Sequence, residues 1–152
     1  MQIIACGNPQ CGDDGAGWLV VDRLRELGIE AFGVRTNTCL GEAAGLLNAL
    51  PGDEDVILLD AAVTGAPVGS VHRWEGVPPA ASKRSASTHG LGVAEALRLA
   101  LALGRMPKSL LVYGIEGKQF APGSLPSPKV QEAAEDLAQQ IRGTIQTGWT
   151  PK

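Results

Sequence analysis

Three stretches of the chain are apolar without the alternation of apolar and polar residues that a half-exposed strand shows. They cover residues 2–6, 55–60 and 110–115. Continuous apolar strands are typical of largely parallel sheets that are covered on both faces. We therefore expect three buried strands, with the first two in the middle of the sheet.

Helical patterns, in which apolar residues recur at spacings of three and four, alternate with these strands. The expected helices cover residues 18–27, 42–50, 88–103 and 128–145. Gly28 is the expected end of the first helix, and the hydroxyl of Thr88 or Ser87 is expected to cap the third. Ser127 and Pro128 supply a cap and a first-turn proline for the last helix.

Two weaker strands complete the pattern. We expect one of them over residues 31–36, followed by a loop over residues 37–41. Residues 69–74 predict the other. Because a parallel crossover needs about a dozen residues or more, the short connection after Asp60 favours an antiparallel strand near an edge. The chain is thus expected to be an α/β protein, with a single three-layer α/β/α domain over residues 1–152 and a mixed five-stranded sheet with one antiparallel strand.

Composition and charge argue against several classes of protein. A chain of 152 residues fits one domain, and its formal charge of -3, with scattered Lys and Arg, gives no footprint for nucleic acid. The sequence contains no leader pattern and no apolar run near the ~20 residues of a membrane helix, so we expect no membrane contact and a cytoplasmic location. The cysteines Cys6, Cys11 and Cys39 are odd in number and lack paired metal spacing, which disfavours a disulfide scaffold.

The residues that could take part in catalysis or metal binding follow the ends of predicted strands. Asp14 follows the first strand, Asp60 ends the third, and His89 begins the helix after the fourth. In open α/β sheets this carboxyl edge is the usual place for ligands. Two carboxylates and an imidazole suit a borderline divalent ion such as nickel or zinc. A histidine in a first helical turn is also kept neutral by the helix dipole.

Each of these residues also has a simpler interpretation. Asp13 and Asp14 are N-cap residues by type, Asp60 is a turn residue, and His89 is a helix end beside solvent. A phosphate loop is disfavoured, because the glycines do not form G-x-G-x-x-G and the two acids would repel phosphate. The same acids oppose a thiolate at Cys11.

Four segments in order carry a family resemblance. They are Gly7-Asn8 with Asp13-Asp14-Gly15, the strand ending in Asp60-Ala61, Ser87-Thr88-His89, and Gly114-Ile115-Glu116 with the later Ser127-Pro128. Over nearly its whole length the chain resembles the maturation peptidases of nickel-iron hydrogenases. The resemblance implies an α/β/α fold with a mixed five-stranded sheet. It also implies a peptidase that removes a C-terminal extension from the hydrogenase large-subunit precursor after nickel insertion.

The resemblance further implies that Asp14, Asp60 and His89 recognise nickel presented by the precursor, with zinc or cadmium able to replace it in a crystal. These three are the expected catalytic and metal-binding residues, and Asp13 is a possible addition. We expect the protein to act as a monomer. Two alternatives stay open, a non-catalytic metal-binding chaperone of the large subunit and a small hydrolase with its own zinc.

Substrate contacts are expected on three segments. A basic loop around Lys83 and Arg84, and Glu116 with the loop that follows it, are candidates for the walls that hold the extension. Asn37 and Thr38 lie where many family members have Asp-Gly-Gly-Thr. This departure is expected to bear on which hydrogenase is processed, and it leaves the fold prediction unaffected.

Overall fold

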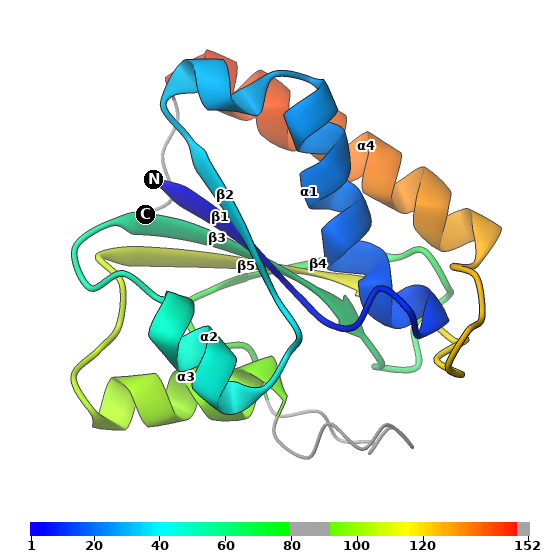
Figure 1. The fold of residues 1–152 in the computed structure, drawn as a ribbon, viewed down its shortest axis with the longest axis horizontal. Coiled ribbons are helices and arrows are strands. Elements are labelled where there is room, and N and C mark those ends of the chain that lie inside the picture. The colour runs from blue at the N-terminus through cyan, green and yellow to red at the C-terminus, as the bar shows by residue number, and fades with distance from the viewer. Residues whose placement is uncertain (80–91, 149–152) are drawn as a thin grey trace.

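A five-stranded sheet forms the middle layer of the computed structural model, which describes residues 1–79 and 92–148 (Figure 1). The strands are β1 (Gln2–Cys6), β2 (Arg35–Cys39), β3 (Asp55–Ala62), β4 (Val71–Glu75) and β5 (Ser109–Glu116). Their order is β2-β1-β3-β5-β4. Only β4 is antiparallel to its neighbour, and it lies at an edge, as the short connection after β3 predicted.

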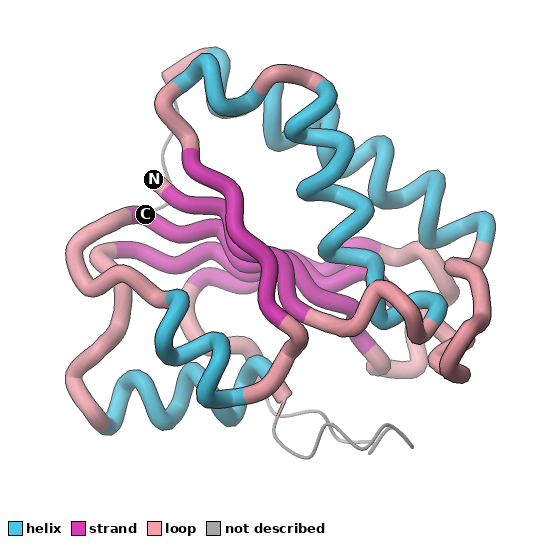
Figure 2. Tube along the Cα trace, viewed as in Figure 1, coloured by secondary structure: helices cyan, strands magenta, loops and turns pink. Residues whose placement is uncertain are grey.

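Helices cover both faces of the sheet (Figure 2). They are α1 (Ala16–Glu26), α2 (Ala43–Ala49), α3 (Val93–Ala102) and α4 (Pro128–Gln146), with short 3-10 turns η1 (Gly12–Gly15) and η2 (Ile29–Phe32). α1 and α4 pack on one face, whereas α2 and α3 pack on the other. The predicted three-layer α/β/α class with a mixed sheet is therefore confirmed.

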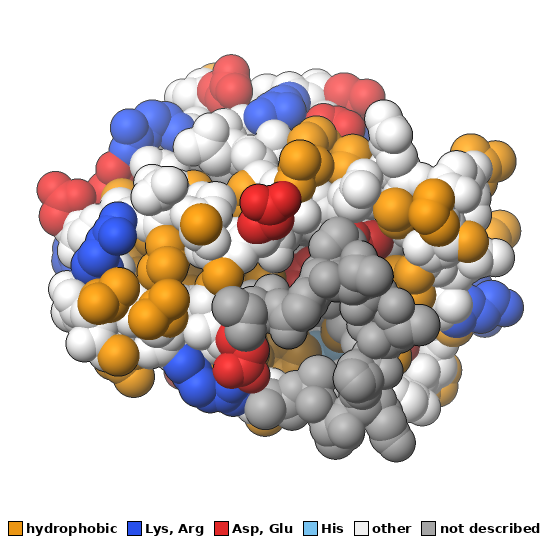
Figure 3. All heavy atoms as spheres, turned by 60° about the horizontal axis from the view of Figure 1, so that its bottom comes forward, with side chains coloured by type: hydrophobic (Ala, Val, Ile, Leu, Met, Phe, Trp, Pro, Cys, Tyr) orange, Lys and Arg blue, Asp and Glu red, His pale blue; other side chains and the backbone are white. Residues whose placement is uncertain are grey.

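Figure 3 shows charged side chains of both signs on one face of the molecule. On the face in Figure 3, Lys and Arg lie among acidic and apolar side chains, and those of the described residues form no basic patch there. Within residues 1–79 and 92–148, no helix combines the length and the apolar character that crossing a membrane requires.

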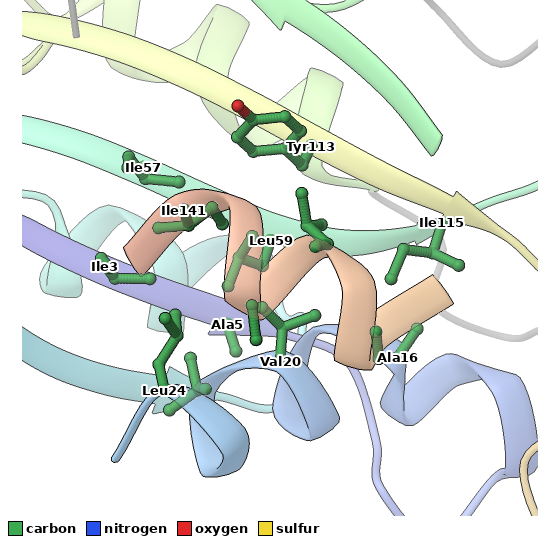
Figure 4. Packing of buried hydrophobic residues seen from close by; sticks show 14 of the residues in the cluster. Ile3, Ala5, Ala16, Val20, Leu24, Ile57, Leu59, Tyr113, Ile115 and Ile141 are labelled. Atoms are coloured by element: carbon green, nitrogen blue, oxygen red, sulfur yellow. The ribbon is translucent and has the colours of Figure 1, made fainter. Parts of the chain in front are cut away.

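Both faces of the central strands are buried. Ile3 and Ala5 of β1 contact the α1 and α4 layer, where Val20 and Leu24 of α1 meet them (Figure 4). The intervening residue Ile4 packs against α2 and α3 instead. Burying one such side chain contributes about 1.5–3 kcal/mol. Two covered faces therefore explain why these strands show no alternation. The expected inner face of α4 is also buried, and it consists of Val130, Ala134, Leu137, Ile141 and Ile145.

The second strand differs from its prediction. β2 covers Arg35–Cys39, so residues 37–39 are strand where a loop was expected, and residues 29–32 form η2. β2 is an edge strand of polar residues, and its hydrogen bonds to β1 define it. An exposed polar edge strand has no apolar pattern to locate it, which is why the prediction was wrong.

The third long helix also begins later than predicted. α3 starts at Val93, and its N-cap is Gly92 in an extended conformation, with no side-chain hydrogen bond. The expected capping residues Ser87 and Thr88 lie outside the described residues. His89, which is also outside them, precedes α3 in sequence. The expected effect of a helix dipole on this histidine therefore stays a prediction.

Candidate active site

Asp14 and Asp60 come together at the carboxyl edge of the sheet. Asp14 lies in η1, after the loop that leaves β1, and Asp60 lies near the end of β3, the neighbour of β1. Partial burial raises the pKa of the Asp60 carboxyl well above its usual value, and the negative charge of Asp14 raises it further. The two carboxyl groups therefore interact electrostatically, as the shared sheet edge predicted.

This pair of acids is electrostatically unfavourable when both are ionised. Among the described residues, a backbone hydrogen bond from Ala61 opposes the rise in the Asp60 pKa, whereas the nearby Cys39 adds to that rise. Like charges in a partly dehydrated site either retain a proton or attract a cation. A cation would offset the repulsion between the two carboxylates, so Asp14 and Asp60 could serve as two ligands to a divalent ion.

The loop after β1 holds Asp14 in place. The backbone N–H of Asn8 donates a hydrogen bond of 2.7 Å to Oδ2 of Asp14. Gly7 has φ of +117°, and a Cβ at this position would lie 2.0 Å from the Asp14 carbonyl oxygen. Only glycine allows this crossing of the chain. Asp14 does not cap α1, whose N-cap is Gly15, so the N-cap interpretation of Asp14 is wrong.

The start of α1 lies directly against the end of β3. A Cβ added at Gly17 would be 2.5 Å from the Leu59 carbonyl oxygen and 3.3 Å from the Asp60 nitrogen. The absence of a side chain at Gly17 therefore permits the close approach of helix and strand. This approach brings η1, and with it Asp14, to the level of Asp60.

Asp13, the neighbouring acid, is fully buried and engaged elsewhere. Its Oδ2 accepts hydrogen bonds from the N–H of Lys118 at 2.9 Å, the N–H of Gln119 at 3.0 Å and the hydroxyl of Ser127 at 2.7 Å. Burial raises the pKa of Asp13, but these donors outweigh it and hold the pKa below its usual value. A buried carboxylate with a low pKa is a weak base, so this arrangement gives Asp13 a structural role.

Glu116 is likewise a buried acceptor. Its carboxylate accepts hydrogen bonds from the hydroxyl and N–H of Thr64 and from the N–H of Ala66. His72 Nε2 lies 3.3 Å from its Oε1. Burial raises the pKa of Glu116, but these donors lower it more. Glu116 therefore ties the loop after β3, close to Asp60, to the end of β5.

The remaining candidates lie on β2 or outside the described residues. Asn37 and Thr38 lie on β2, where Asn37 Nδ2 donates a bond of 3.4 Å to Oε1 of Gln2. Lys83 and Arg84, like His89, lie outside the described residues. Within residues 1–79 and 92–148, no group of three or more His, Cys, Asp and Glu side chains is arranged to hold a metal ion.

One pair near the site was missed by the sequence analysis. The Sγ atoms of Cys6 and Cys39 are 3.0 Å apart, because these residues are register partners at the ends of β1 and β2. Cys39 had no interpretable context as a loop residue. A prediction that β2 extends to Cys39 would have identified this pair.

Comparison with known sequences identifies a protein family and a relative to which this chain is similar. The sequence model of the family HycI, described as hydrogenase maturation protease, matches residues 41–144. The hydrogenase expression/formation protein HupD of Thiocapsa roseopersicina is 28% identical over 148 residues, which are 90% of this chain and 67% of HupD.

Two solved structures show the same fold. The NiFe hydrogenase maturation protease HycI from Thermococcus kodakarensis is 24% identical with a TM-score of 0.69, and the match covers 95% of this chain and 92% of that one. The hydrogenase maturating endopeptidase HybD from E. coli is 21% identical with a TM-score of 0.72, and the match covers 99% and 96% of the two chains.

Proposed function

Since this chain belongs to the hydrogenase maturation protease family and is therefore a peptidase, we propose that it processes the large-subunit precursor of a nickel-iron hydrogenase. The cleavage removes a C-terminal extension after nickel has been inserted. Membership of a protease family favours this function over that of a non-catalytic chaperone. In this proposal the protein acts as a monomer in the cytoplasm, and the precursor is its partner.

The observation that carries the proposal is the meeting of Asp14 and Asp60. Burial and the charge of Asp14 both raise the pKa of Asp60, so the pair is poised to exchange a proton for a cation. We assign Asp14, Asp60 and His89 as ligands to the nickel that the precursor presents. Two carboxylates and one imidazole leave coordination positions for ligands from the precursor.

Nickel recognition of this kind positions the peptide bond to be cut. Fixing the metal at the sheet edge also fixes the chain attached to it, and proximity can lower a barrier by several kcal/mol. Around this point, Asn37 and Thr38 on β2 and the segment after Glu116 are proposed to contact the extension. Lys83 and Arg84 are proposed to complete the contacts.

Mass spectrometry of the precursor tests the proposed cleavage. Nickel-loaded precursor incubated with this protein should lose a short C-terminal peptide, and Asp60→Asn should slow that loss by at least about 100-fold. Asp53→Asn is the matched control, because Asp53 is an exposed acid in the loop before β3 and its loss should leave cleavage unchanged. A stable complex with precursor of unchanged mass would contradict the proposal.

Metal analysis of the purified protein separates this function from that of a hydrolase with its own zinc. If nickel arrives with the precursor, the protein alone should carry no stoichiometric divalent ion. Zinc that copurifies in a one-to-one ratio, and whose removal stops cleavage, would favour the zinc hydrolase instead.

A further inference from the structure

Two thiols meet beside the acidic pair in a geometry that a disulfide requires. Cys6 and Cys39 are the last residues of β1 and β2, they are register partners, and both contact the cluster under α2 and α3. Their Sγ atoms are 3.0 Å apart, and both are free thiols. Adjacent strands lie about 4.8 Å apart, which is within the range of about 4.4–6.8 Å that disulfides span between Cα atoms.

We propose that Cys6 and Cys39 form an oxidisable dithiol, which hydrogen peroxide converts into a disulfide that links β1 to β2. The nickel recognition proposed for Asp14, Asp60 and His89 does not involve these thiols. The proposal rests on strand register and sulfur proximity, so it stands independently of the proposed function.

The two thiols differ in exposure and in pKa, as a reaction with one attacking and one resolving thiol requires. Cys39 is half-buried, whereas Cys6 is fully buried. A hydrogen bond from Cys6 and another from the Gly41 N–H lower the pKa of Cys39 to about 7, against the opposing effect of burial. The hydrogen bond to Cys39, burial and the charge of Asp60 raise the pKa of Cys6. Cys39 is therefore the attacking thiolate and Cys6 the resolving thiol.

The reaction balances with peroxide as the oxidant. The Cys39 thiolate attacks one peroxide oxygen, so that an S–O bond forms, the O–O bond breaks, and the departing hydroxide takes a proton to become water. The Cys6 sulfur then attacks the sulfenic acid sulfur. An S–S bond forms, the S–O bond breaks, and the hydroxyl leaves with the Cys6 proton as a second water. Two thiols lose two electrons, which peroxide gains.

The disulfide would act on the loops of the candidate site. Gly7 follows Cys6 directly, and a Cβ added at Gly41 would lie 3.3 Å from the Gly7 nitrogen. The loops after β1 and β2 are therefore in contact, and the first of them holds Asp14 through Asn8. Oxidation would fix both loops with a covalent bond.

Unfolding, followed by alkylation with iodoacetamide and intact-mass analysis, tests the proposal. The reduced chain has three cysteines and should take up three groups after unfolding. Peroxide-treated protein should lose two hydrogen atoms and take up one group. The Cys11→Ser variant should lose both remaining thiols on oxidation, because only Cys6 and Cys39 are left to pair.

Two further measurements test whether the disulfide joins Cys6 to Cys39. Oxidised Cys11→Ser should melt on the order of 10 °C above its reduced form, because the bond closes a long loop, and dithiothreitol should reverse the shift. Cys39→Ser, checked for an unchanged reduced fold, should form no intramolecular disulfide. The proposal is overturned if oxidised Cys11→Ser still takes up two groups, or if Cys39→Ser forms a Cys6–Cys11 bond equally fast.

Discussion

The carboxylate of Asp13 accepts hydrogen bonds from both the backbone N–H and the hydroxyl of Ser127, which lies 114 residues later in the chain. Ser127 is the N-cap residue of α4, but its hydroxyl bonds Asp13 and makes no capping bond to the helix. The same carboxylate holds the N–H groups of Lys118 and Gln119. Asp13 therefore ties the turn that carries Asp14 to the beginning of the last helix.

Replacement of Asp13 by alanine should lower the free energy of unfolding by about 3 kcal/mol or more, since three backbone N–H groups would lose their acceptor in a buried place. Urea denaturation measures this loss. Asp22→Asn is the control, because Asp22 lies exposed on α1 and should change stability by less than about 0.5 kcal/mol. Equal effects of the two substitutions would contradict a structural role for Asp13.

Acid should remove the stability that Asp13 provides. Its pKa is lowered in the folded protein, so the unfolded chain binds the proton more tightly. The contribution is complete above the unfolded pKa of about 4 and is lost as the pH falls through the folded value. Urea titrations between about pH 7 and pH 3 should show a smaller decline in Asp13→Asn than in the wild type. Parallel curves for the two proteins would count against this assignment.

Gly17→Ala should destabilise the fold although alanine favours helices. The new Cβ would lie 2.5 Å from the Leu59 carbonyl oxygen, so α1 must move away from β3, at a cost of about 1–3 kcal/mol. Gly143→Ala on the exposed side of α4 meets nothing within 4 Å and should stabilise by about 0.5–1 kcal/mol. Thermal melts of both variants measure the contrast, and a Gly17→Ala protein that melts above the wild type would disprove the close approach.

Asp60→Asn should separate stability from activity. The folded pKa of Asp60 is raised, so this carboxyl costs stability as the pH rises above its unfolded pKa. The variant should be more stable than the wild type by about 1 kcal/mol at neutral pH, with no gain below about pH 4. Its cleavage rate should fall by at least about 100-fold. Denaturation at both pH values tests the first statement, and a variant that is less stable at neutral pH would refute it.

The central layer was predictable because β1 and β3 are apolar on both faces. The same regularity allowed Asp14 and Asp60 to be placed at one edge, since each follows or ends one of these strands. β2 was not predictable in the same way, because an exposed edge strand of polar residues takes its position from hydrogen bonds to β1.

The role of Asp13 could not be found from local sequence. Its partners at residues 118, 119 and 127 are more than 100 residues away, and a carboxylate before a helix is most simply interpreted as a cap. The thiol pair was missed for a related reason. The proximity of Cys39 to Cys6 follows from the register of β2 with β1, which was not predicted from the sequence.

The proposed recognition of nickel is tested most directly by the cleavage rates of nickel-loaded and nickel-free precursor under the same conditions. If Asp14, Asp60 and His89 bind the inserted metal, the wild-type protein should cut the loaded precursor at least about 100-fold faster. His89→Ala should remove that difference. Equal cleavage of the two precursors by the wild-type protein would contradict recognition of nickel at this site.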